Sequence, residues 1–171
     1  MCPLPVLRSL YFSIFNSHLS YGLVVWGNAN RLYIDIIKTL QKRAMAFSHK
    51  ENNVNINSIH HNLKILNIDH QLQVQLSSLM WDYDHDILPI SLKMHFKKAN
   101  LVHNYSTRAA SKGNLHYVKV NTTKYGINSF KYQGVKILND LKNMSIYQNS
   151  DKKSVFLKEL KSDLLSTYVA E

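Results

Sequence analysis

The sequence predicts a mainly α-helical protein, a small helical bundle with one short extended or β patch in its C-terminal half. Three observations favour this class. Apolar residues recur every three to four positions in several long segments. Only five glycines and three prolines interrupt 171 residues, which leaves little room for long linkers. One short stretch alternates between apolar and polar residues instead, as a strand does.

The first fifty residues predict two helical segments separated by a stop. Residues 7–19 are rich in aromatic side chains and are expected to be helical, and the apolar run continues over 21–26 until Gly27 ends it. Asn30 then offers an N-cap for a second helix. Its apolar positions share one face, which we expect to turn inward: Leu32, Ile36, Leu40, Ala44 and Phe47. The opposite, mostly basic face carries Arg31, Asp35, Lys38 and Lys42.

The rest of the chain changes character after Asn100. Before it, we expect a polar loop at 49–57, a helix at 69–83, and a new helix capped by Asp86 with Pro89 in its first turn. After it, residues 115–120 predict a short strand, and helical spacing returns over 129–141 and 154–168. We therefore expect a helical region over 1–100 and a basic C-terminal region over 101–171 with a short strand and two helices.

The positive charge of the chain is concentrated in one segment. The net charge is +10, and no Asp or Glu occurs between Ile87 and Asn139, a run that holds nine Lys and Arg. A surplus of positive charge usually indicates that the protein binds a polyanionic partner. The alternative is an ordinary solvated basic surface.

Several site classes find little support. Cys2 is the only cysteine, so neither a disulfide framework nor a cysteine-based zinc site is expected. The apolar stretch at 10–27 is interrupted by Asn16, His18 and three serines, and predicts a buried helix rather than a membrane span. The nine histidines lack the spacing of a metalloprotease helix, and no phosphate-cradling glycine loop or nucleophile elbow is present.

The sharpest acidic cluster is "WDYDHD" at 81–86. Carboxylates at this density can hold Mg²⁺ and cut phosphodiesters, so Asp82, Asp84 and Asp86 define a nuclease hypothesis. The cluster differs from a polymerase Tyr-x-Asp-Asp motif because His85 separates the last two acids and the surroundings are helical. A solvated helix end is the simpler interpretation.

The acid-free run is typical of nucleic-acid binding. Its cations alternate with aromatic residues, and exposed rings can stack on unpaired bases while Lys and Arg neutralise phosphates. Within "HNYSTR" (103–108), Arg108 is either a phosphate contact, with the Ser106 and Thr107 hydroxyls beside it, or an internal clamp. The residues predicted to contact nucleic acid are Lys97, Lys98, His103, Tyr105, Arg108, Lys112, Lys119, Lys124, Lys131 and Lys136.

A series of short motifs, in order, resembles the region downstream of the polymerase core in jockey-type non-LTR retrotransposon reverse transcriptases. The motifs are "LRSLYFSIFNSHLSYGLVVWG" (7–27), "LQKRAMAF" (40–47), "LPISLKMHF" (88–96), "HNYSTR" (103–108), "FKYQGVKILNDL" (130–141) and "FLKELKSDLL" (156–165). The chain departs from the family pattern at Ala46, where a basic residue is usual, at Leu138 in place of Trp, and at Lys142 in place of Pro.

The resemblance implies a parent RNA-directed DNA polymerase that uses Mg²⁺ and primes on nicked target DNA. In that family the catalytic Asp residues and the endonuclease lie upstream of these motifs, so we expect this chain to be a non-catalytic C-terminal fragment without a cofactor of its own. Its expected partners are RNA or an RNA–DNA hybrid, with the upstream polymerase core as a further candidate partner and with no membrane. The expected location is intracellular, in the nucleus or a cytoplasmic ribonucleoprotein. The alternative is a segment that only packs against the polymerase core.

Overall fold

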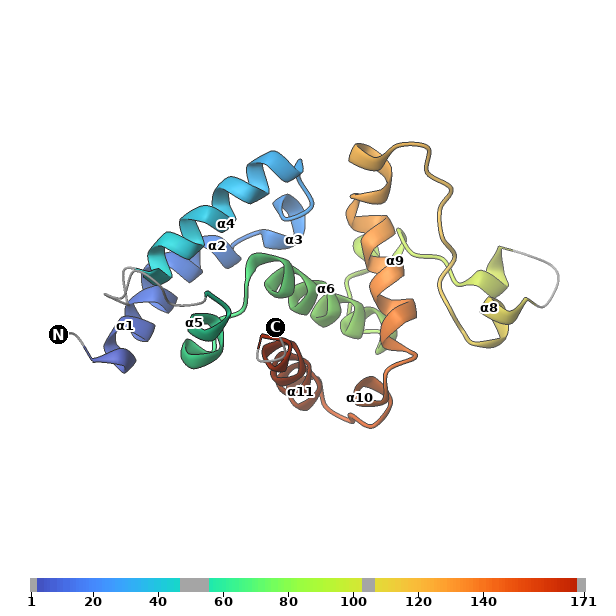
Figure 1. The fold of residues 1–171 in the computed structure, drawn as a ribbon. Helices are drawn as coiled ribbons and strands as arrows, with labels where there is room; N and C mark the ends of the chain where they lie inside the picture. The colour runs from blue at the N-terminus through green and yellow to red at the C-terminus, as the bar shows by residue number, and fades with distance from the viewer. Residues whose placement is uncertain (1–2, 47–55, 103–106, 169–171) are drawn as a thin grey trace. The chain divides into compact units, whose positions relative to one another are not determined.

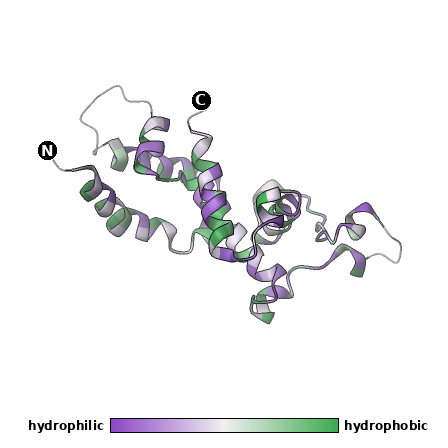
Figure 2. Ribbon diagram, turned by 90° about the horizontal axis from the view of Figure 1, so that it is seen from below, coloured by the Kyte–Doolittle hydropathy of each residue, from purple (hydrophilic) through white to green (hydrophobic). Residues whose placement is uncertain are grey.

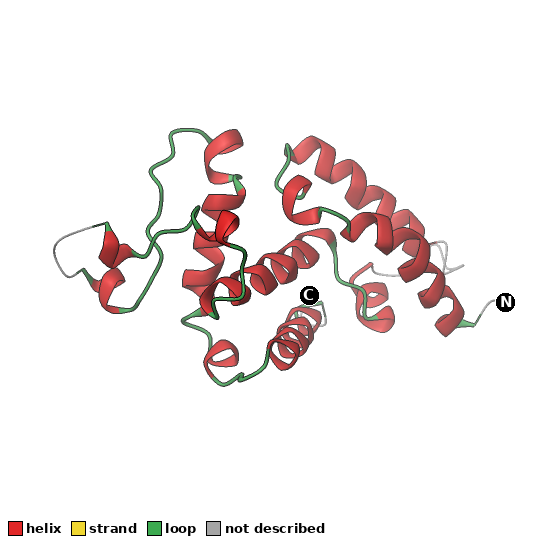
Figure 3. Cartoon of the chain, turned by 180° about the vertical axis from the view of Figure 1, so that it is seen from behind, coloured by secondary structure: helices red, strands yellow, loops and turns green. Residues whose placement is uncertain are grey.

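The computed structural model describes residues 3–46, 56–102 and 107–168. Within these ranges the secondary structure is helical and contains no strand (Figures 1 and 3), so the predicted mainly α class is confirmed. The helices are α1 (Leu4–Leu10), the π-helix η1 (Tyr11–Asn16), α2 (Ser17–Ser20), α3 (Leu23–Trp26), α4 (Arg31–Ala46), α5 (Ile56–Leu63), α6 (Ile68–Asp84), α7 (Ile90–Lys93), the 3₁₀ helix η2 (Ala99–Leu101), α8 (Arg108–Ser111), the π-helix η3 (Thr123–Ile127), α9 (Phe130–Leu141), α10 (Ser145–Gln148) and α11 (Lys153–Ser166).

The chain forms two compact units. Unit 1 comprises residues 1–72 and 160–171, and unit 2 comprises residues 73–159. The helices of both units carry hydrophobic and hydrophilic residues along their length (Figure 2). No helix in the described ranges has both the length and the apolar character needed to cross a bilayer.

Unit 1 is held together by two hydrophobic clusters that share the ring of Phe15. The first cluster comprises Tyr11, Met45, Ile59, Leu63 and Ile65. The second comprises Leu19, Leu23, Ile34 and Ile68, with Trp26, Ile37 and Leu72 at its margin. The helix α5, which the sequence analysis placed partly in a loop and otherwise missed, supplies Ile59 and Leu63 to the first cluster.

The helix α4 begins where predicted but buries a different face. The Asn30 side chain accepts a hydrogen bond from the Leu32 N–H (3.2 Å), as an N-cap does. Contrary to expectation, Leu32 and Ile36 are 72% and 59% exposed, whereas Ile34 and Gln41 are buried. Gln41 is tolerated inside because its Nε2 donates to the Tyr11 hydroxyl and to the Leu66 carbonyl, both at 2.9 Å. The predicted position Phe47 lies outside the described residues.

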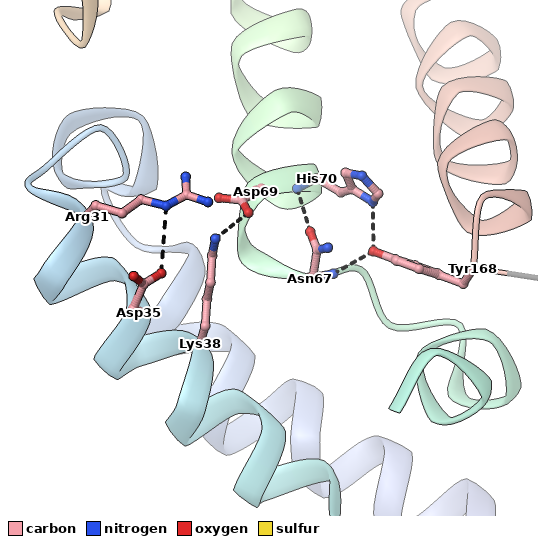
Figure 4. A network of polar contacts seen from close by, with 7 residues as sticks. All are labelled: Arg31, Asp35, Lys38, Asn67, Asp69, His70 and Tyr168. Atoms are coloured by element: carbon pink, nitrogen blue, oxygen red, sulfur yellow. Dashed lines mark hydrogen bonds and ion pairs between the residues drawn. The ribbon is translucent and has the colours of Figure 1, made fainter. Parts of the chain in front are cut away.

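A polar network joins α4, the start of α6 and the C-terminal end of the chain within unit 1 (Figure 4). Lys38 pairs with Asp69. Asn67 caps α6 by accepting the His70 N–H at 2.8 Å, and its own N–H donates to the Tyr168 hydroxyl at 3.0 Å. Burial of the side chain is the main reason that the pKa of Tyr168 is raised to about 12. The hydroxyl therefore keeps its proton and remains both a donor and an acceptor in this network.

Unit 2 is built around aromatic side chains. The Trp81 ring stacks on Phe156 with centroids 4.9 Å apart and meets Tyr147 edge-on at 5.1 Å. On another side, Phe96 packs edge-on against Tyr83 and Phe130, at 5.3 and 5.5 Å. Thus α6, α9, α10, α11 and the segment after α7 all contribute to one unit.

Close packing of α9 depends on a glycine. A Cβ atom added at Gly134 would lie 2.9 Å from Cε1 of Phe96 and 3.1 Å from Sδ of Met80. Because both neighbours are buried, the absence of a side chain lets α9 approach α6 and the Phe96 ring closely. This contact fixes α9 against the stretch that begins at Phe96.

The predicted N-cap at Asp86 is wrong. Asp86 has a left-handed backbone (φ 60°) and follows the C-terminal end of α6. The Ile87 N–H donates to the Asp82 carbonyl (2.8 Å) and the Asp86 N–H donates to the Tyr83 carbonyl (3.3 Å), which is the pair of bonds that defines a Schellman motif. The next helix, α7, starts at Ile90 with Pro89 as its N-cap. Asp86 therefore ends a helix instead of starting one.

The strand predicted at 115–120 does not form. Leu115 makes an isolated antiparallel bridge with Lys98, and residues 116–120, called the extended segment below, belong to no helix or strand. The His116 N–H donates to the Lys97 carbonyl at 2.8 Å, on one side of the segment. On the other side, the buried Asn139 amide accepts from the Leu115 N–H (2.8 Å) and donates to the Leu115 carbonyl (3.1 Å). This side chain on α9 takes the place of a neighbouring strand, so the segment is anchored without a sheet.

Candidate nucleic-acid interface

Three segments of unit 2 converge on a groove of about 390 Å³. The first is the stretch from His95 to Val102, the second is the extended segment after Leu115, and the third is the first turn of α9. The residues that line this basic groove, as we call it, are His95, Lys97, Leu101, Val102, His116, Val118, Lys119 and Lys131.

The backbone contacts already described hold these segments together. The pairing of Lys97 with His116 fixes the first segment against the second. Asn139 fixes the second segment to α9, and Gly134 lets α9 pack directly on Phe96, the neighbour of Lys97. Each of the three lysines therefore extends from a backbone that is anchored to the other two segments.

The electrostatic character of the groove follows from its composition. It contains three lysines and two imidazoles, and no carboxylate lines it. The ion pairs formed among the described residues involve other lysines: Lys38, Lys93, Lys142 and Lys153, together with Arg31. Lys97 and Lys119 are exposed and Lys131 is half-buried. Concentrated positive charge in a concave surface attracts anions more strongly than the same charge on a flat one.

The structure brings together only part of the predicted site. Lys97, Lys119 and Lys131 line the basic groove, whereas Lys98, Arg108, Lys112 and Lys136 are exposed residues that do not line it. His103 and Tyr105 lie outside the described residues, as does the side chain of Lys124.

Arg108 begins the short helix α8, which Thr107 caps by accepting the Ala110 N–H at its hydroxyl oxygen (3.1 Å). The exposure of Arg108 favours a contact with a ligand over an internal clamp, and both roles stay predictions. The Thr107 oxygen already serves as a helix cap, so the hydroxyl is held close to the start of α8 rather than turning freely toward a phosphate.

Five lining residues were not predicted from the sequence: His95, Leu101, Val102, His116 and Val118. The predicted site consisted mainly of lysines and of aromatic residues beside them, and none of these five is a Lys, Arg, Phe, Tyr or Trp. One signal was available, since each of the five lies within four residues of a predicted lysine, and His116 and Val118 alternate along the extended segment.

The acidic cluster forms a different arrangement. Asp82 accepts from Lys153 Nζ at 2.6 Å. Asp84 lies 3.2 Å from Lys142 Nζ and accepts from the Tyr147 hydroxyl at 2.8 Å. Asp86 pairs with Lys93. Each carboxylate thus faces a different lysine, and nowhere in the described ranges do three or more His, Cys, Asp or Glu gather in a way that could hold a metal ion.

Comparison with known protein families, with curated proteins and with solved structures returns no match for this chain.

Proposed function

We propose that the chain is a non-catalytic C-terminal segment of a jockey-type non-LTR retrotransposon reverse transcriptase, and that it binds RNA or an RNA–DNA hybrid through the basic groove. The family assignment rests on the ordered motifs in the sequence. The observation that carries the binding function is the convergence of Lys97, Lys119 and Lys131, from three separate segments, on one groove lined by no carboxylate.

The physical basis is phosphate neutralisation. A lysine that contacts a phosphate releases condensed counterions, so the affinity falls as salt rises. Each contact contributes roughly 0.7 to 0.9 to the slope of log affinity against log salt. Three contacts therefore contribute about 2 to 3 to that slope. Between 1 M and 0.1 M salt, a slope of about 2 raises the affinity about a hundredfold, which is the gain that the three lysines should supply at 0.1 M salt.

The test is fluorescence anisotropy with single-stranded RNA and with an RNA–DNA hybrid across a salt series. A triple variant carrying Lys97→Gln, Lys119→Gln and Lys131→Gln should lose about a hundredfold in affinity near 0.1 M salt, with a slope smaller by about 2. The matched control carries Lys152→Gln, Lys158→Gln and Lys161→Gln, which removes three exposed cations that do not line the groove. The control should keep the wild-type slope. Equal losses in both variants would attribute binding to net charge and sink the groove proposal.

A second function, packing against the polymerase core, is favoured by a separate observation in unit 1. The α4 residues Leu32, Tyr33, Ile36 and Leu40 are all exposed. An exposed apolar stripe of this kind on a helix commonly marks a protein contact. Because α4 carries four basic residues and one acidic residue, its occupant would be a face of the polymerase core with an apolar centre and an acidic rim.

Co-purification with the polymerase segment of a jockey-type element tests this second function. The wild-type chain should be retained, and a Leu32→Ser, Ile36→Ser variant should not, while the affinity of that variant for RNA stays unchanged. The control Asp35→Ser, Thr39→Ser alters two exposed residues of the same helix that belong neither to the apolar stripe nor to the basic residues and should be retained. Wild-type chain that sediments as a dimer through Leu32 and Ile36, without retention by the polymerase segment, would identify a second copy as the occupant instead.

A further inference from the structure

The basic groove combines two chemically different kinds of lining. Its lysines are suited to phosphates, but Leu101, Val102 and Val118 are apolar and exposed to solvent, with Leu101 77% exposed. Exposed apolar side chains are individually common, but three in one groove beside three lysines form a mixed surface. A ligand that contacts both the lysines and the apolar residues of the groove must therefore carry negative charge and also present an apolar face.

A double helix satisfies only the charged part. Its outer surface offers phosphates and sugars, while the flat faces of its bases are stacked on one another. An unpaired strand offers phosphates and accessible base faces at the same time, and proteins hold an extruded base between aromatic or apolar side chains. The groove volume of about 390 Å³ lies in the range of small-molecule pockets, which suits a unit of nucleotide size better than a helix.

We infer that the basic groove holds an unpaired nucleotide of a single strand, with its base against Leu101, Val102 and Val118 and its flanking phosphates on Lys97, Lys119 and Lys131. The inference rests on the proposed nucleic-acid binding and narrows it from RNA or hybrid to single-stranded segments. His95 lies at the same surface and is placed to contact the base edge or face.

The backbone arrangement supports a preformed site for such a base. Val118 lies on the extended segment that Asn139 and Lys97 anchor at Leu115 and His116. Leu101 ends the 3₁₀ helix η2, whose first residue Ala99 donates its N–H to the Asn114 carbonyl at 3.0 Å. The apolar residues are therefore held on the same paired backbone as the lysines, so base and phosphate contacts can form together without a large rearrangement.

The test compares three labelled probes of one sequence: single-stranded RNA, single-stranded DNA and the RNA–DNA hybrid. The groove variant is Leu101→Ser, Val118→Ser, and the matched control is Ile90→Ser, Val155→Ser. The exposed fractions of the control pair, 78% and 43%, are close to those of the groove pair, 77% and 37%. All four side chains are exposed, so each variant should fold as the wild type does, which circular dichroism and thermal unfolding check.

The groove variant should lose about 5-fold or more in affinity for both single strands, since removing apolar base contacts with two aliphatic side chains costs about 1 kcal/mol or more by the apolar area involved. Its salt slope should stay at the wild-type value because the lysines are intact. Its affinity for the hybrid should not change, and the control should bind all probes as the wild type does. A stronger loss for RNA than for DNA would show that the 2′-hydroxyl is also contacted.

Two results overturn the inference. One is a groove variant that binds single strands as tightly as the wild type. The other is an equal loss for the hybrid and the single strands. In either case the lysine triple variant keeps the two proposals apart: if it loses affinity and slope, nucleic-acid binding stands and only the single-strand assignment fails. If it binds like the wild type, both fail.

Discussion

Two regions of unit 2 carry unusual charge, and the fold treats them in opposite ways. The acidic turn at 82–86 has three carboxylates within five residues, and each of them faces a different lysine, two of which come from distant parts of the chain. The basic groove has three lysines that are far apart in the sequence, and it is lined by no carboxylate. The acidic charge is compensated inside the protein, whereas no carboxylate lines the groove beside the three lysines.

The difference shows why charge density along the chain is a poor guide to a binding site. A metal ion at the acidic turn would have to compete with Lys93, Lys142 and Lys153 for the same carboxylates. The geometry therefore gives the nuclease hypothesis no support, and favours a structural role in which the turn ties α6 to α7, α10 and α11. The acid-free run differs from the acidic turn, because all the residues that line the groove come from this run and none of them is a carboxylate.

The largest expected effect comes from removing the most connected carboxylate of the acidic turn. Asp84→Ala leaves the hydroxyl of the buried Tyr147 without its acceptor. It also removes the ion pair with Lys142, whose Nζ still donates a hydrogen bond to the Gly113 carbonyl at 2.8 Å. We expect the free energy of unfolding to fall by about 1 to 3 kcal/mol, the cost of a buried polar group left unpaired. Urea denaturation measures this value.

Asp84→Asn is the control that separates the hydrogen bond from the charge. The amide oxygen can still accept from Tyr147, so the loss should be about 1 kcal/mol or less, as expected for a partly exposed ion pair. Affinity for RNA should stay at the wild-type value in both variants while they are folded. If Asp84→Ala abolished RNA binding in folded protein, the two regions would not be independent and the comparison would fail.

A smaller effect is expected at the exposed end of the acidic turn, in the acid range. The hydrogen bond from Lys93, and then its charge, lowers the pKa of Asp86 below the ordinary value of 3.8. Because the pKa is lower in the folded state, the stabilisation from this pair is fully present above 3.8 and is lost as pH falls through the folded pKa. Lys93→Gln should raise the pKa of Asp86 toward 3.8, which carboxyl NMR titration between about pH 2 and 5 measures.

The same variant also sharpens the contrast with the groove. Lys93 does not line the basic groove, so Lys93→Gln should leave the salt slope of RNA binding unchanged at neutral pH. A slope reduced by about 0.7 would instead make Lys93 a phosphate contact, and would show that the paired lysines are available to the ligand as well.

Sequence patterns that depend on local backbone chemistry predicted much of the fold. The N-cap at Asn30, the helix over 69–83 and the final helix were all identified from capping residues and apolar spacing. These features depend on neighbours three or four positions away, which the sequence displays directly. The N-cap predicted at Asp86 failed for a local reason. Asp86 has a residue type that favours N-caps, but the preceding helix ends there in a Schellman motif closed by the Asp82 and Tyr83 carbonyls.

The buried face of α4 was predicted wrongly for a different reason, because the partners that decide it are distant in the sequence. The helix has apolar residues on more than one side, at Leu32 and Ile36 and again at Ile34 and Ile37, so its spacing alone does not select the face that packs. Tertiary contacts decide which face of α4 is buried. The Tyr11 hydroxyl and the Leu66 carbonyl accept hydrogen bonds from Gln41, and Asp69 pairs with Lys38. None of these partners lies within twenty residues of the side chain that it satisfies.

By itself, the sequence determined the helical class, the helix starts at Asn30 and Ser129, and the concentration of positive charge in an acid-free run, because propensity, capping and composition are local properties. Only the tertiary structure decided which of the lysines line a common groove. Asn139 anchors the extended segment to α9, and the missing side chain at Gly134 lets the Phe96 ring pack on the same helix. Together these contacts bring Lys97, Lys119 and Lys131 to one groove. Long-range packing sets that arrangement, since residues 34 positions apart become neighbours only when the chain folds.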